Sequence, residues 1–198
     1  MSDLKCEYPE GCRLDLWAKV IKAKYIAKGV KVLERTLCIP SCPLEEGGVG
    51  GYISLVDDFK VKVNCATEIL NFNKVKITID FDLVLIVVVE PDSDYQVYTI
   101  PNITYEDTIE LCEFNPPLTP EEFRSEIDSS ELILCKWDFD YDIKGHCEDE
   151  HSPCRHHVLR PPVPGTCIEV AVFVDIIDKL GKMHDIIVYG ELDPEVDC

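Results

Sequence analysis

The amino-acid sequence predicts an all-β fold, an antiparallel β-sandwich of about seven or eight strands with one short helix. Three observations support this fold class. Apolar and polar side chains alternate along most segments, turn-forming residues separate those segments, and no strand–helix–strand rhythm typical of a parallel sheet is present. The chain has 198 residues, of which 46% are hydrophobic, so it can bury the core of one domain.

The alternation places a β-strand in each of seven segments. The first strand has a competing interpretation, because the segment from Leu14 to about Ala27 can also be read as a helix. The clearest strand is KVKITIDFDLVLIVVVE, and a turn around Asp178–Lys182 is expected to separate the last two strands. Strands are expected near residues 19–39, 52–65, 74–90, 95–111, 131–143, 167–177 and 183–192.

The buried core is predicted from the apolar faces of two of these strands. In each strand every second residue is apolar, which is the pattern of a sheet with one face covered. The residues expected to be buried are Val75, Ile77, Ile79, Phe81, Leu83, Leu85, Val87, Val170, Val172 and Val174.

One helix is expected near residues 119–128. Thr119 has a side chain that can cap a helix, Pro120 suits the first helical position, and Glu122 stands three residues after the cap. This spacing is typical of a capping box.

The domain organisation predicted is one body with short polar ends. Residues 1–13 form a polar leader that contains Cys6 and Cys12, and residues 14–192 form the β-sandwich. A loop rich in His and Cys interrupts the body at residues 144–165. Residues 193–198 form an acidic tail that ends in Cys198.

Charge excludes several classes of partner. Asp and Glu number 38 against 19 Lys and Arg, a formal net charge of −19, which disfavours nucleic acid and anionic membranes. Residues 1–40 carry a net +3 and residues 91–198 a net −18. These regions can attract each other within one molecule or between neighbours. The alternative is that the acidic residues form a solvated face.

The eleven cysteines are unusual for a chain whose first residues lack the hydrophobic segment of a signal peptide. An odd number leaves at least one thiol without an internal partner. Cys6, Cys12 and Cys198 lie in the polar ends, and we expect them to form disulfides between neighbouring chains. The alternative for many of the cysteines is a buried free thiol, since cysteine packs as a small apolar side chain.

The His/Cys loop contains the one cluster of metal-ligand residue types. Thiolate and imidazole are the ligands that zinc prefers, and the best set is Cys147, His151, Cys154 and His157. The alternative is a disulfide-tethered loop with exposed histidines, and no cofactor. No phosphate-binding loop or nucleophile elbow is present, so no catalytic residue is predicted and an enzyme is not expected.

Three stretches resemble the β-domain of spore-coat and exosporium proteins known as the SPOCS domain. They are IAKGVKVL at 26–33, the strand at 74–90 followed by YQVYTIPNITYEDTIEL, and IIVYGEL at 186–192. Ile100-Pro101-Asn102 departs from the family, which favours an aromatic residue after the proline. The resemblance implies structure and assembly, with no catalytic residues.

The function expected is therefore a self-assembling structural protein of the bacterial endospore surface, in a coat, exosporium lattice or appendage, cross-linked by disulfides. The resemblance implies synthesis in the mother-cell cytoplasm without a signal peptide and deposition on the spore surface. The partners expected are further copies of the chain and other spore-surface proteins, without nucleic acid or membrane. The alternative function is a zinc-binding β-module that uses the loop at 146–157.

Overall fold

The computed structural model describes residues 13–40, 51–146 and 165–189 of the chain. These residues form six long strands and one short α-helix, so the predicted all-β class is confirmed and the predicted count of seven or eight strands was wrong. The elements are β1 (Arg13–Pro40), β2 (Tyr52–Asn71), β3 (Lys74–Glu90), β4 (Asp94–Glu110), the 3₁₀ turn η1 (Leu111–Glu113), α1 (Pro120–Glu126), β5 (Ser129–His146) and β6 (Gly165–Tyr189).

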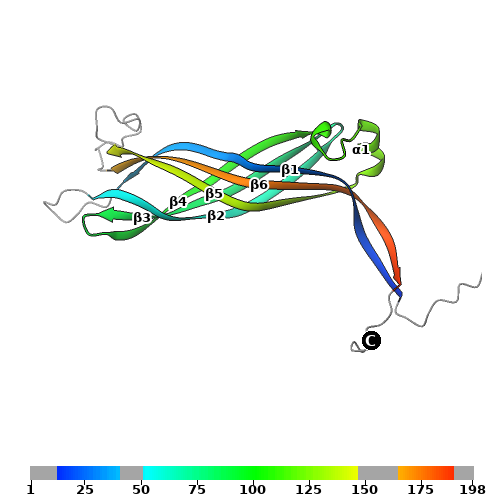
Figure 1. Cartoon of the computed structure of the whole chain (residues 1–198), viewed down its shortest axis with the longest axis horizontal. Coiled ribbons are helices and arrows are strands. Elements are labelled where there is room, and N and C mark those ends of the chain that lie inside the picture. Colours follow the sequence, from blue (N-terminus) through cyan, green and yellow to red (C-terminus); the bar gives the residue numbers. More distant parts are fainter. Residues whose placement is uncertain (1–12, 41–50, 147–164, 190–198) are drawn as a thin grey trace, which may run out of the picture.

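The six strands form two three-stranded antiparallel sheets that lie one above the other (Figure 1). One sheet has the order β1-β6-β5 and the other the order β2-β3-β4, so β6 and β3 are the central strands. Across the two layers β1 contacts β4, while β2 contacts β5 and β6. One side of the body therefore carries the edges of β1 and β4, and the opposite side carries those of β2 and β5.

The core lies between the two sheets and is built mainly from the central strands. All ten residues that the sequence predicts to be buried are fully buried, which confirms both apolar faces. Aromatic rings join the layers: the centroids of Phe59 and Phe139 are 5.0 Å apart, and those of Phe81 and Trp137 are 5.5 Å apart. The two sheets thus share one hydrophobic core.

The turn predicted around Asp178–Lys182 was wrong. Residues 165–189 form the single strand β6, and β1 pairs with it from Arg13↔Tyr189 to Pro40↔Gly165. Asp178 and Gly181 interrupt the apolar alternation there. The strand nevertheless continues, because β1 and β5 supply hydrogen-bond partners to the backbone of β6 on both sides. The competing helical interpretation of residues 14–27 was also wrong, because β1 is extended throughout.

The other elements stand near their predicted positions, although β1 begins at Arg13, six residues before the predicted start at residue 19. β2 continues six residues beyond the predicted end, to Asn71, and α1 is shorter than predicted. The capping box is confirmed, since Glu122 N–H donates to Thr119 Oγ1 at 3.2 Å and Thr119 N–H donates to Glu122 Oε2 at 2.9 Å. No helix in the described part of the chain is long and apolar enough to cross a membrane.

A two-stranded ribbon leaves the body at the end near α1 (Figure 1). This β1–β6 ribbon comprises residues 13–20 and 182–189, and β5 has no counterpart there because its pairing begins at Ser129↔Gly181. Gly181 marks the start of the ribbon. A Cβ atom at that position would lie 2.5 Å from the carbonyl oxygen of Val20, so only glycine allows the two strands to approach this closely.

Candidate functional site

All site residues predicted from the sequence lie outside the described residues. This holds for the disulfide candidates Cys6, Cys12 and Cys198, and for the zinc candidates Cys147, His151, Cys154 and His157. Both sets therefore stay predictions. Within the described ranges, no group of three His, Cys, Asp or Glu side chains is placed to hold a metal ion.

Three strands and the turn η1 carry free thiols that the sequence interpretation did not single out. Cys65 and Cys112 are free and exposed, Cys135 is free and partly covered, and Cys167 is free and buried. Cys38 stands opposite Cys167 in the β1–β6 register and is not free. The interpretation as a buried free thiol is thus confirmed for Cys167.

The most unusual polar group lies between the two sheets, on the inner face of β6. Asp178 is completely buried, and apart from the neighbouring carboxyl group of Glu68 neither of its carboxylate oxygens has a hydrogen-bond partner among the described residues. Glu68 approaches from β2 in the other sheet, and its Oε1 atom is likewise buried without a partner. An unpaired buried carboxylate is costly, so this acid pair requires a chemical explanation.

The pKa of Asp178 is raised to about 8. Burial is the largest cause, because the charged form loses its hydration, and the neighbouring Glu68 carboxyl acts in the same direction through a hydrogen bond and its charge. Lys19 lowers the pKa, but less strongly. Burial and the second acid therefore favour the protonated form of Asp178.

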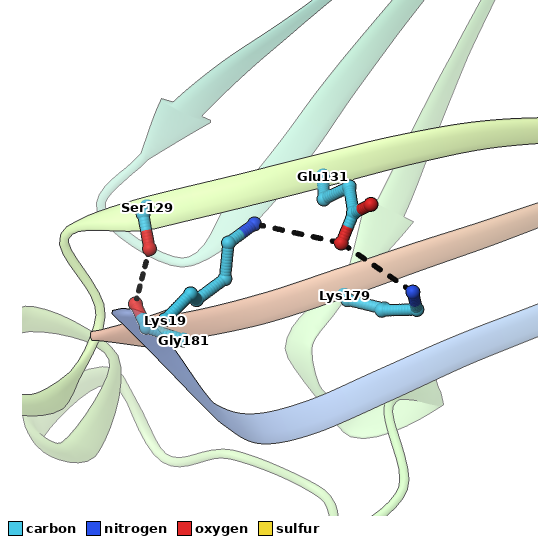
Figure 2. Close-up of polar contacts among 5 residues, drawn as sticks. All are labelled: Lys19, Ser129, Glu131, Lys179 and Gly181. Carbon is cyan, nitrogen blue, oxygen red and sulfur yellow. Dashed lines mark hydrogen bonds and ion pairs between the residues drawn. The ribbon is translucent and has the colours of Figure 1, made fainter. Parts of the chain in front are cut away.

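A network of charged side chains covers the outer face of the same sheet near the ribbon (Figure 2). Glu131 Oε2 accepts a hydrogen bond from Lys179 Nζ at 3.4 Å and forms an ion pair with Lys19 Nζ at 3.9 Å. Beside it, Ser129 Oγ donates to the carbonyl oxygen of Gly181 at 3.2 Å. These contacts join β1, β5 and β6 where the ribbon begins.

Two hollows on the surface of the described residues do not combine the groups of a catalytic centre. One hollow is lined by Leu70, Phe72, Phe123 and Ile127 with Arg124, next to α1. Another lies on the outer face of the β1-β6-β5 sheet and is lined mainly by carboxylates, two of which pair with Lys144. Neither places a nucleophile beside a base.

The edges of β1 and β4, which share one side of the body, have opposite charge. β1 contains seven basic and two acidic residues, whereas β4 contains four acidic and no basic ones. Hydrophobic side chains are also exposed along both strands: Ile26 is 54% exposed, Tyr95 66% and Val97 65%. We call this side the β1/β4 face.

Sequence reasoning missed the acid pair, although one signal was present. Asp178 has the same parity as the alternating apolar residues from Ile168 to Ile176, so a continuous strand would place it in the core. Nothing in the local sequence of Glu68 indicates its partner, because the two residues lie on different sheets.

Comparison with known proteins identifies a family that matches part of the chain. No curated protein and no solved structure matches the chain. A family described as a domain of unknown function, DUF8305, matches residues 88–193, from the last residues of β3 to beyond the end of β6. This match covers more than half of the 198 residues. The chain therefore belongs to the DUF8305 family.

Proposed function

We propose that this protein is a structural subunit of the endospore surface that assembles with copies of itself. The observation that carries the proposal is the opposite charge of two strand edges on one side of the body, β1 and β4. The resemblance of residues 26–33, 74–111 and 186–192 to the SPOCS domain supports the spore surface as the location. The two-layered all-β body suits a building block, and no catalytic activity is proposed.

The β1/β4 face is self-complementary. A two-fold axis parallel to the strands places β1 of one copy beside β4 of the next and, at the same time, β4 beside β1. A two-fold axis perpendicular to the sheets would instead place β1 beside β1, which brings like charges together. Charge therefore selects the first arrangement, in which strand edges without a neighbouring strand among the described residues can form hydrogen bonds across the interface.

Part of this face is already covered within one molecule. The backbone of Lys24 exchanges two hydrogen bonds with Asn115, at 3.0 and 2.8 Å, so the segment after η1 pairs with β1 at that point. Beyond it, the outer edge of β1 forms no ladder with another described strand. We place the contact on this open part, with Lys28 exposed at its start.

Charge reversal tests the interface. Lys28→Glu is expected to weaken self-association about three- to tenfold, because it turns an attraction to β4 into a repulsion. Glu106→Lys in the same chain should restore association, since the opposite charges are then exchanged between the strands. Analytical ultracentrifugation at low and high salt measures the dissociation constant.

Lys60→Glu provides the matched control, because Lys60 is equally an exposed strand lysine but lies on β2. Its dissociation constant should stay near that of the wild type. An equal loss in both single variants would show that net charge, and not this face, governs the association.

Covalent cross-linking is the second part of the proposal. A Cys6→Ser, Cys12→Ser, Cys198→Ser triple variant is expected to lose the ladder of oligomers on a non-reducing gel, because polar ends can reach a neighbouring chain. Cys65→Ser, Cys112→Ser removes the two exposed thiols of the body and should keep the ladder. The reverse result would assign the cross-links to the body instead of the ends.

A further inference from the structure

The inner face of β6 is apolar at every second residue except one. Ile168, Val170, Val172, Val174, Ile176 and Leu180 are all buried side chains of this face, and Asp178 stands between the last two. A carboxyl group in the middle of such a face lowers stability unless its charge is removed or matched. The described residues supply no N–H or O–H donor to either of its oxygens.

The side chain that approaches Asp178 is a second acid. Glu68 lies on β2, opposite Ile77 in the β2–β3 register, and reaches Asp178 from the other sheet. Two adjacent buried carboxyl groups are not readily ionised together, because each negative charge raises the cost of the other. One proton held between them satisfies both: a carboxylic acid donates and a carboxylate accepts.

The other described groups around the pair do not neutralise its charge in place of this proton. Lys19 on β1 is the one cation that acts on Asp178, and its amine is directed to Glu131 on the outer face. In the register of the sheet, Asp178 stands between Tyr25 on β1 and Leu132 on β5. On β4, Asp107 accepts the hydroxyl hydrogen bond of Tyr105 at 3.1 Å. Burial raises the pKa values of Tyr25 and Tyr105, and the charge of Asp107 raises both further.

We propose that Asp178 and Glu68 share a single proton across the two sheets, and that losing this proton in alkaline solution loosens the end of the body from which the ribbon leaves. The pair lies three residues from Gly181, where β5 ends its pairing with β6. Repulsion between two carboxylates would act on β2 and β6 at this point and separate the layers. The pair therefore holds β2 and β6 together in a pH-dependent way within one chain, independently of self-association. We call this contact the pH-sensitive lock.

The direction of the pH dependence follows from the two states. An unfolded aspartate loses its proton near pH 4, whereas in the folded chain the pKa of Asp178 is about 8. Between these values the folded state holds more protons than the unfolded state, so stability falls as the pH rises. The fall begins near pH 4 and levels off above about pH 8.

Asp178→Asn tests the lock, because an amide N–H donates to Glu68 without titrating. The midpoint of thermal unfolding of the wild-type monomer should fall between pH 5 and pH 9, while that of Asp178→Asn should stay nearly constant. Asp57→Asn is the matched control, since Asp57 is exposed on β2; it should follow the wild type. Equal slopes for wild type and Asp178→Asn would overturn the proposal.

Two further measurements keep the test decisive if Asp178→Asn does not fold. Glu68→Gln removes the partner acid, and its unfolding midpoint should depend less on pH than that of the wild type. Carbon-13 NMR of the Asp178 carboxyl should show titration near pH 8 in the wild type, with faster amide hydrogen exchange of β2 and β6 around the pair above that pH. Titration near pH 4 would show that no proton is shared.

Discussion

Phe81→Ala is expected to lower the free energy of unfolding by about 3–5 kcal/mol. Phe81 is fully buried in the central strand β3, and its ring lies 5.5 Å from that of Trp137 in the other sheet. Removing the ring leaves a cavity between the layers, which the two rigid sheets cannot close. Urea denaturation followed by circular dichroism measures the change.

The same substitution at Phe72 is the control. Phe72 lies in the turn between β2 and β3 and is 80% exposed, so Phe72→Ala should change stability by less than about 0.5 kcal/mol. If the two variants lose similar stability, the ring of Phe81 does not join the layers as described.

Gly181→Ala is expected to cost about 1–3 kcal/mol and to displace the β1–β6 ribbon. The added Cβ would lie 2.5 Å from Val20 O and 3.1 Å from Val20 C, both backbone atoms that cannot move without breaking the register. The carbonyl oxygen of Gly181 also accepts from Asp128 N–H at 3.0 Å, so a shift there disturbs the start of β5. Urea denaturation gives the stability change, and hydrogen exchange of residues 182–189 reports the ribbon.

Gly29 offers the comparison for this variant. It has a φ of +60° and no atom within 4 Å of an added Cβ. Asparagine tolerates that backbone conformation, so Gly29→Asn should cost only a few tenths of a kcal/mol. A loss at Gly181 no larger than the loss at Gly29 would mean that the close approach to Val20 does not fix the ribbon.

The sequence predicted the fold class well where a single period extends along a strand. β3 was predicted with its observed bounds, because all 17 of its residues follow one alternation that needs no information from the rest of the chain. The capping box of α1 is likewise a local pattern, and it was predicted for the same reason.

The errors arose where distant residues determine the structure. Asp178 and Gly181 have the composition of a turn, yet β1 and β5 hold this segment extended by pairing with it on both sides. The acid pair could not be predicted, since its two members meet only when the sheets stack. The charge difference between β1 and the later strands was visible in the sequence, but the side on which β1 and β4 meet was not.

Strand order has a consequence for how the chain folds. The sheet β2-β3-β4 is made of consecutive strands joined by short turns, so its contacts are local and can form early. In the other sheet the first strand pairs with the last, and closing that loop brings together residues separated by nearly the whole chain. Of the described strands, β1 is synthesised first and β6 last. The 28 residues of β1 therefore lack their partner strand until β6 has been made. The slow step of folding is therefore expected to be the pairing of β1 with β6, after the sheet β2-β3-β4 has formed.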